Sequence, residues 1–309
     1  VPATVALGLA ASRQAPVASR VASTLCSLPA THPMARSLRV MLTVVLVAGA
    51  LLALLALFVR RVEARLAFFP ERGEPYTPAR SGIPFQPIDV RTADGETLRA
   101  WWMPRDAAAA TVLYLHGNGG HLSMWAPVLE RTWRRGYAVF ALDYRGYGVS
   151  TGTPSERGLY RDIDAALDAL DALRPPAPVI YWGRSLGTVM AAYAATRRAP
   201  DGLILEAGFP DARSVLAGSP LWLLSWLASY RFPAAEFLGQ VSVPTLVMHG
   251  DRDGVIPFPL GQRLFESARG PRRFFTIAGG DHNEVDPPDP GAYWHAIAEF
   301  VQTLPPDRP

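Results

Sequence analysis

The sequence predicts an α/β protein whose mostly parallel central sheet is covered by helices on both faces. From residue 111 to residue 304, short apolar runs alternate with longer segments of helical period. Buried strands separated by helices are typical of parallel sheets. In addition, a serine between two glycines, in Gly183-Arg184-Ser185-Leu186-Gly187, joins an apolar run to an Ala-rich segment. This pattern is typical of a tight turn between a strand and a helix.

The first element is an apolar segment that we predict to be a membrane anchor at residues 38–61. Residues 40–59 carry no charge, and twenty residues of helix are about 30 Å long, the thickness of the hydrocarbon core of a bilayer. The run is longer than the apolar part of a signal peptide, and Arg60 and Arg61 follow it without a cleavage site of small residues. We therefore expect an uncleaved, single-pass anchor. Arginines flank it on both sides, so the side of the membrane that holds the catalytic part stays open.

The segments that flank the anchor are expected to lack regular structure. Residues 1–37 are rich in Ala, Ser, Val and Pro without a sustained period, which predicts a disordered leader, and Met34 is an alternative start of the chain. Residues 62–86 combine Pro, Gly and polar side chains. They suit a linker or an extended covering segment.

The catalytic domain is expected at residues 87–305. Its first two strands are predicted near 88–91 and 98–102, with Asp94-Gly95 as the turn between them. Further strands are expected at 111–115, 138–142, 179–182, 203–206, 245–249 and 273–277, and helices near 125–135, 158–173, 260–268 and 293–304 and directly after Ser185. Asp143 is expected to fix its loop together with Arg145. The polar face of the helix at 158–173 is expected to hold Asp162, Asp164, Asp168 and Asp171.

Residues 209–240 interrupt this alternation with apolar residues of helical character. In one interpretation they form one more covering helix of the core. In the other they form a small helical cap over the active site, which receives an acyl or alkyl group. The candidates for that substrate pocket are Leu221, Trp222 and Trp226.

The charge distribution argues against a nucleic acid partner. All 30 basic residues are arginine, and seven of them lie in the first 65 residues with Glu63 as the one acid there. The rest of the chain has 23 arginines against 26 acids, so it offers little attraction to a phosphate backbone. Cys26 is the single cysteine, which excludes an internal disulfide and a cysteine-based metal site. We expect no metal and no cofactor.

Ser185 is the predicted nucleophile of a Ser-His-Asp arrangement. A serine hydroxyl needs a base within hydrogen-bond reach and a third group to orient that base. His282 is the best base, because it follows the strand at 273–277 on a glycine-rich loop. Asp251 and Asp253 follow the strand at 245–249 and lie between the serine and the histidine in chain order. Position alone does not choose between these two carboxylates.

The loop directly after the strand at 111–115 is predicted to stabilise a negatively charged oxygen. Its sequence is His116-Gly117-Asn118-Gly119-Gly120. We assign the backbone N–H groups of Asn118 and Leu186 as the two donors of an oxyanion hole. A phosphate-binding loop is the alternative, but the chain has no lysine for a Walker-type loop and the glycine spacing is not that of a dinucleotide site.

These motifs together resemble the α/β-hydrolase superfamily, and within it the membrane-anchored abhydrolase-domain branch that includes protein-depalmitoylase-like serine hydrolases. The resemblance spans about residues 66–304 and rests on the blocks 115–120, 143–158, 183–188, 243–253 and 280–283. It implies an α/β-hydrolase fold, with Ser185 as nucleophile, Asp253 as acid and His282 as base. The chain departs from the family pattern at Asp281, where a small residue is usual, and at Gly119-Gly120-His121.

The sequence therefore predicts a membrane-anchored serine hydrolase that cleaves carboxylic esters or thioesters through an acyl-enzyme. The apolar insertion and the anchor favour a small-molecule or lipid substrate with an apolar acyl group. The same triad also serves amide cleavage, C–C bond cleavage and cofactor-free peroxidase reactions, so these stay open. A non-catalytic binding protein that retains the fold is the remaining alternative, and the complete set of triad and oxyanion residues argues against it.

Overall fold

The computed structural model describes residues 33–175, 178–218, 229–284 and 286–305 of the chain. The chain forms two compact units, residues 1–58 and residues 59–309. Most of the predicted leader lies outside the described residues. So do the three pocket candidates of the insertion, Leu221, Trp222 and Trp226.

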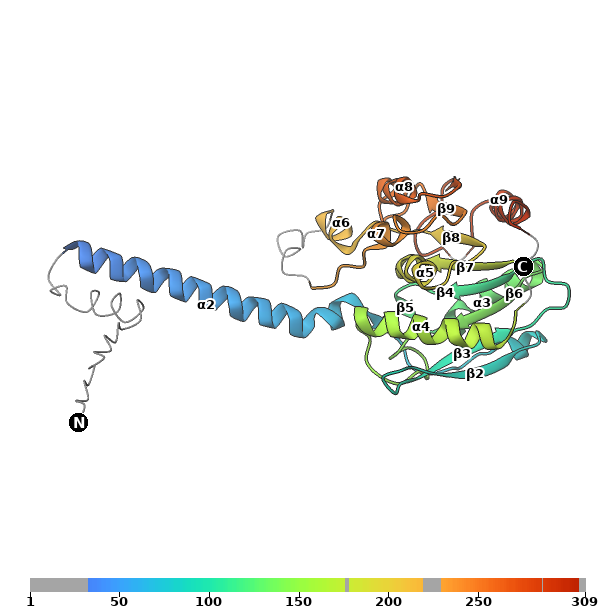
Figure 1. The fold of residues 1–309 in the computed structure, drawn as a ribbon, viewed down its shortest axis with the longest axis horizontal. Coiled ribbons are helices and arrows are strands. Elements are labelled where there is room, and N and C mark those ends of the chain that lie inside the picture. Colours follow the sequence, from blue (N-terminus) through green and yellow to red (C-terminus); the bar gives the residue numbers. More distant parts are fainter. Residues whose placement is uncertain (1–32, 176–177, 219–228, 285, 306–309) are drawn as a thin grey trace, which may run out of the picture. The chain divides into compact units, whose positions relative to one another are not determined.

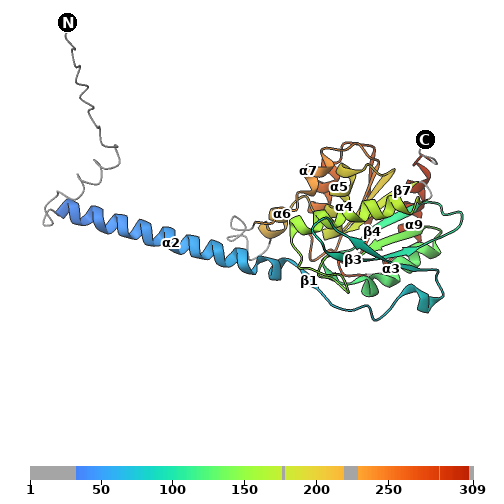
Figure 2. The same cartoon turned by 60° about the horizontal axis from the view of Figure 1, so that its bottom comes forward.

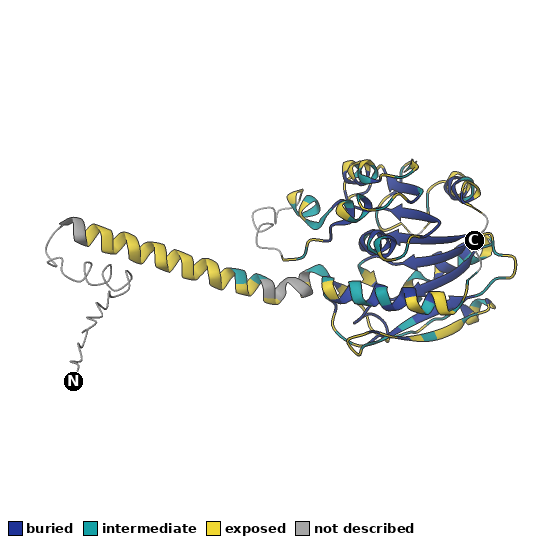
Figure 3. Ribbon diagram, in the orientation of Figure 1, coloured by how far each residue is buried: buried dark blue, intermediate teal, exposed yellow. Residues whose placement is uncertain are grey.

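Helix α2 contains the predicted membrane anchor. It runs over Pro33–Ala67, and its segment Arg36–Val59 has 24 residues with a mean hydropathy of 2.9. At 1.5 Å per residue this segment is about 36 Å long, which suffices to cross a bilayer. Its side chains are not buried within the protein (Figure 3). The helix begins before the predicted anchor and continues to Ala67, so the start of the predicted linker is helical.

An eight-stranded sheet forms the centre of the second unit, in the order β10-β9-β8-β7-β4-β6-β3-β2 (Figure 1). β2 and β3 pair in antiparallel fashion, β3 is also antiparallel to β6, and the remaining pairs are parallel. The mostly parallel sheet is thus confirmed. The bounds are Gln86–Arg91 for β2, Thr97–Met103 for β3, Thr111–Leu115 for β4, Ala138–Leu142 for β6, Val179–Arg184 for β7, Gly202–Glu206 for β8, Thr245–Gly250 for β9 and Arg272–Ile277 for β10.

Helices cover both faces of the sheet. Successive side chains of a strand point to opposite faces, so a buried strand contributes side chains to two separate cores. In β4, for example, Leu113 belongs to one core cluster while Val112 and Tyr114 belong to the other. The first cluster packs against α4 (Glu156–Ala172), α5 (Leu186–Arg197), α7 (Ala234–Leu238) and α8 (Phe258–Ser267). The second packs against α3 (Leu122–Arg134) and α9 (Pro290–Gln302) (Figure 2). The central strands β4, β6, β7, β8 and β9 are fully buried, whereas β2 and β10 at the two edges of the sheet are partly exposed (Figure 3).

The segment directly after α2 packs against the loop that follows β4. A second, two-stranded parallel sheet joins β1 (Phe69–Pro70) to β5 (Gly119–Gly120). Phe68 is buried, with its ring 5.5 Å from that of Tyr230 and 6.0 Å from that of Phe232. The Asn118 side chain donates a hydrogen bond to the Ala67 carbonyl oxygen at 2.6 Å. This small sheet was not predicted, since neither of its two-residue strands has a sequence period.

The insertion between β8 and β9 contributes two short helices among the described residues. α6 covers Ala212–Ala217, with the Asp211 carboxylate accepting a hydrogen bond from the Ser214 N–H at its start. α7 buries Ala234 and Leu238 against the core. α7 therefore packs on the core, while the apolar run at 221–227 on which the two interpretations depend lies outside the described residues.

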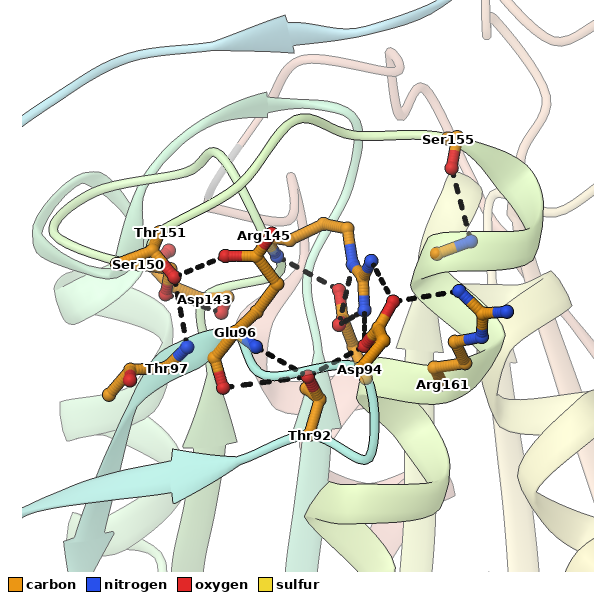
Figure 4. A network of polar contacts seen from close by, with 12 residues as sticks. Thr92, Asp94, Glu96, Thr97, Asp143, Arg145, Ser150, Thr151, Ser155 and Arg161 are labelled. Atoms are coloured by element: carbon orange, nitrogen blue, oxygen red, sulfur yellow. Dashed lines mark hydrogen bonds and ion pairs between the residues drawn. The ribbon is translucent and has the colours of Figure 1, made fainter.

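A polar network holds the β2–β3 turn against the loop after β6 (Figure 4). Arg145 donates both terminal nitrogens to Asp94, at 2.9 and 3.0 Å, and its Nε to Asp162 at 2.8 Å. Two expectations are wrong here. Asp162 is fully buried rather than on a polar helix face, because it neutralises the buried Arg145. The Asp143 side chain accepts from the Leu122 N–H instead of pairing with Arg145.

Candidate active site

Ser185 occupies a strained turn between β7 and α5. Its φ of 53° and ψ of −117° are unusual for a residue with a side chain. The flanking glycines explain why the turn is possible. A methyl group on Gly183 would overlap the Gly187 carbonyl oxygen, and one on Gly187 would overlap the Leu115 carbonyl oxygen at the end of β4. The start of α5 can therefore pack directly on β4, which leaves the serine hydroxyl on the outside of the turn.

The loop after β10 brings His282 to this hydroxyl. His282 Nε2 lies 3.0 Å from Ser185 Oγ, and His282 Nδ1 lies 2.7 Å from Asp253 Oδ2. The three predicted side chains thus form one continuous chain of hydrogen bonds, although they come from the ends of three different strands. The Asp253 carboxylate can only accept a hydrogen bond, so the ring proton is on Nδ1. The lone pair on Nε2 therefore faces the hydroxyl. This arrangement can remove the proton of Ser185.

The structure separates the two candidate acids. Asp251 is exposed, and its carboxylate accepts a hydrogen bond from the Gly279 N–H at 2.7 Å. Asp253 is buried, and its second oxygen, Oδ1, accepts from the N–H groups of Val255 and Ile256 at 2.9 and 2.7 Å. Asp253 is therefore the carboxylate held against His282.

A second histidine, His249, contacts the same carboxylate. Its side chain is fully buried, with Nε2 3.4 Å from Asp253 Oδ2 and 2.9 Å from the Ile256 carbonyl oxygen. Burial on its own would raise the pKa of Asp253, but the hydrogen bonds from His249 and His282 outweigh it and hold that pKa well below its usual value. Asp253 therefore stays ionised at neutral pH. His249 lies near the end of β9, and no motif around it in the sequence indicates this contact.

The glycine-rich loop after β4 lies beside the serine. A methyl group on Gly117 would be 3.5 Å from Ser185 Cβ, which shows how closely the loop backbone approaches the turn. Tyr147 holds the next residue, because its hydroxyl donates to the carbonyl oxygen of Asn118 at 2.9 Å and to Oδ1 of Asn118 at 3.0 Å. Burial raises the pKa of Tyr147, so this hydroxyl keeps its proton.

Of the two predicted oxyanion donors, Leu186 directly follows Ser185, and Asn118 directly follows Gly117, whose backbone approaches the serine turn. Leu186 is the first residue of α5, where backbone N–H groups have no partner within the helix. Among the described residues, neither the Asn118 N–H nor the Leu186 N–H donates to another backbone group. His116, which precedes the loop, is fully buried, with Nε2 3.4 Å from Asp143 Oδ1. It supports the loop from within the core.

Two further features of the site are its possible metal ligands and the cavity beside it. In the part of the chain that the structure describes, no three His, Cys, Asp or Glu side chains gather as metal ligands. The small cavity beside the triad has a volume of about 20 Å³ and is lined in part by Arg184, Glu206 and Asp253. A cavity of this size holds about one water molecule, which is too little for an acyl group.

Comparison with known proteins agrees with this geometry. The family described as serine aminopeptidase S33 matches residues 106–241. The uncharacterized protein Rv2307c of Mycobacterium tuberculosis is 34% identical over 272 residues, which cover 86% of this chain and 95% of that protein. The lysophosphatidylserine lipase ABHD12 of Macaca fascicularis is 35% identical over 189 residues, 53% of this chain and 47% of the lipase.

A solved structure has the same fold. The esterase Pf2001 of Pyrococcus furiosus superimposes with a TM-score of 0.65 over 77% of this chain and 98% of the esterase, at 20% sequence identity. The serine turn, the parallel sheet and the extent of the match to the mycobacterial protein all point the same way. The chain belongs to the α/β-hydrolase superfamily, in its abhydrolase-domain-like branch.

Proposed function

We propose that the protein is a membrane-anchored serine hydrolase that cleaves carboxylic esters or thioesters with an apolar acyl group. The observation that carries this proposal is the hydrogen-bonded series from Ser185 Oγ through His282 to Asp253, with spacings of 3.0 and 2.7 Å. A serine with this geometry is activated for attack on a carbonyl carbon.

The reaction proceeds in two halves. His282 Nε2 takes the Ser185 proton as Oγ attacks the carbonyl carbon, and Asp253 stabilises the imidazolium that forms. The N–H groups of Asn118 and Leu186 donate to the oxyanion, and the alcohol or thiol leaves with the proton from His282. Water then repeats the sequence on the acyl-enzyme and releases the acid.

An apolar acyl group is supported by the setting of the domain. The span Arg36–Val59 would keep the enzyme at a bilayer, where acyl esters concentrate. The similar macaque protein is named for its action on a lysophospholipid. The three pocket candidates predicted from the sequence, Leu221, Trp222 and Trp226, have the apolar side chains that such a chain needs.

The test of the chemistry is the variant Ser185→Ala. In detergent micelles, the full chain should hydrolyse p-nitrophenyl esters and react with a fluorophosphonate probe, and the variant should lose about 10⁴-fold or more of its turnover and all labelling. Retained labelling at another residue would contradict the assignment.

The test of the substrate class is a panel of p-nitrophenyl esters, acyl thioesters and peptide p-nitroanilides of graded chain length. We expect esters and thioesters of long acids to have a higher kcat/KM than acetyl compounds. A preference for the anilides would mean that the enzyme is an amidase, and equal rates for all chain lengths would remove the role of the apolar insertion.

A further inference from the structure

Arg184, the residue directly before the serine, is buried. Its side chain is only 7% exposed, and Nη1 lies 3.0 Å from Glu206 Oε1. Its other terminal nitrogen, Nη2, donates to two backbone carbonyl oxygens of the loop that carries the base, that of His282 at 2.9 Å and that of Glu284 at 2.7 Å. One guanidinium thus connects the serine turn to the histidine loop.

Glu206 holds this guanidinium in place from the neighbouring strand. It pairs with Arg184 in the register of β7 and β8, and it is buried. Its second oxygen, Oε2, accepts from Trp182 Nε1 at 3.1 Å and from the Tyr293 hydroxyl at 2.9 Å. Every oxygen of the carboxylate is therefore used, which a buried charge requires. Burial would lower the pKa of Arg184, but the Glu206 carboxylate raises it, so the guanidinium stays charged.

The carbonyl groups that Arg184 binds have few other partners available. The residues from 278 to 284 form turns and irregular backbone rather than a helix or strand, so their carbonyl groups have no regular ladder to join. A planar guanidinium can donate to two acceptors at once in a fixed geometry. It therefore fixes the backbone at His282 itself.

We propose that Arg184, oriented by Glu206, is a positioning residue for the base: it holds the His282 backbone where the imidazole reaches both Ser185 Oγ and Asp253 Oδ2. This inference rests on the proposed function, because it gives Arg184 a role only if His282 acts as the base. The competing interpretation is that Arg184 and Glu206 form a buried ion pair that stabilises the fold alone.

Arg145 offers a matched control for that alternative. Its side chain is 6% exposed, and it pairs with the fully buried Asp162 at 2.8 Å. Among the described residues, Arg145 bonds to Asp94 in the β2–β3 turn (Figure 4) and to Asp162 in α4, and not to the histidine loop. Arg145→Met and Arg184→Met therefore remove buried ion pairs of similar exposure, but only the second removes contacts to His282.

The experiment compares both variants in the full chain, in detergent micelles, with p-nitrophenyl acetate as substrate. Arg184→Met is expected to lower kcat about 10²-fold, since a misplacement of about 1 Å costs this much, and to change KM less than threefold. The low-field proton resonance of His282 Nδ1–H should be present in the wild type and absent in this variant. Arg145→Met should unfold at lower urea concentration, keep the resonance and keep kcat within threefold. Arg184→Lys, which supplies a smaller cation, should have a kcat about tenfold higher than that of Arg184→Met and about tenfold lower than that of the wild type.

The outcomes separate this inference from the proposed function. If Ser185→Ala is inactive while Arg184→Met keeps kcat within threefold of the wild type, the positioning role is wrong and the proposed function stands. If Arg145→Met lost as much kcat as Arg184→Met and also lost the resonance, the positioning role would likewise be wrong. The loss would then follow from the removal of any buried ion pair. Turnover by Ser185→Ala would overturn the proposed function itself. If Arg184→Met does not fold, Arg184→Lys decides: a tenfold lower kcat at unchanged KM supports the role, and an unchanged kcat contradicts it.

Discussion

The two glycines of the serine turn are required by packing. A methyl group on Gly187 would overlap the backbone carbonyl oxygen of Leu115, which cannot rotate away as a side chain can. We expect Gly187→Ala to lower the free energy of unfolding by about 1–3 kcal/mol, the typical cost of overpacking, and to slow fluorophosphonate labelling of Ser185. Urea unfolding and labelling rates measure the two effects. Gly218→Ala is the control, because within the described part of the chain the nearest atom to its methyl group would be 3.8 Å away; an equal loss there would show that the packing argument is wrong.

At this scale the sequence predicts residues that carry a motif and misses residues that support it. Ser185 and His282 can be named because their order along the chain and their adjacent glycines have a meaning for chemistry, whereas the choice of Asp253 over Asp251 comes from the family resemblance. His249, Arg184 and Glu206 lie at the ends of β9, β7 and β8, and their partners depend on which strand ends lie side by side. Asp162 shows the same limit, since its helical period indicated a polar face while its partner Arg145 lies in a different loop.

Among the elements, the β2–β3 hairpin is held to the loop after β6 by the ion pair between Asp94 and Arg145. Hydrogen bonds from Arg145, Thr92 and Arg161 hold the pKa of Asp94 well below its usual value. A carboxyl group whose pKa is lower in the folded chain than in the unfolded chain stabilises the fold above the unfolded pKa of about 3.9, and this stabilisation disappears as the pH falls towards the folded value. Asp94→Asn should therefore unfold more easily than the wild type from pH 5 to 8, and the difference should shrink below about pH 4. Urea unfolding at a series of pH values measures it, and a difference that grows in acid would contradict this role.

The strands and helices of the second unit follow the predicted order because each has its own apolar period. The elements that were not predicted have no apolar period of their own. β1 and β5 have two residues each and exist because the Phe69–Pro70 segment lies against Gly119–Gly120. The end of α2 continues a helix into a segment whose prolines and glycines begin only at Pro70 and Gly73, so composition averaged over residues 62–86 indicated a linker.

For the whole molecule, the division into two units predicts that they can be separated. The two core clusters contain residues from Phe68 to Leu304, and the span Arg36–Val59 buries nothing within the protein. Removal of residues 1–58 should therefore leave the packed core complete. The same deletion removes 18 Ala, Val, Leu, Met and Phe residues of the span, and with them the transfer free energy that holds a helix in hydrocarbon.

We expect the full chain to sediment with membranes and to resist extraction by alkaline carbonate, and the chain from Val59 onward to be soluble. On p-nitrophenyl acetate, which needs no membrane, the shorter chain should keep kcat/KM within about twofold, because the spacings of 3.0 and 2.7 Å in the Ser185–His282–Asp253 series involve no residue before Val59. Ser185→Ala in the shorter chain serves as the inactive control.

On long-chain esters presented in vesicles, the shorter chain should lose rate by tenfold or more, since it no longer concentrates at the surface. Equal rates of both chains on vesicles would mean that the anchor contributes nothing to access to the substrate, and sedimentation of the shorter chain with membranes would show a second membrane-binding surface in residues 59–309.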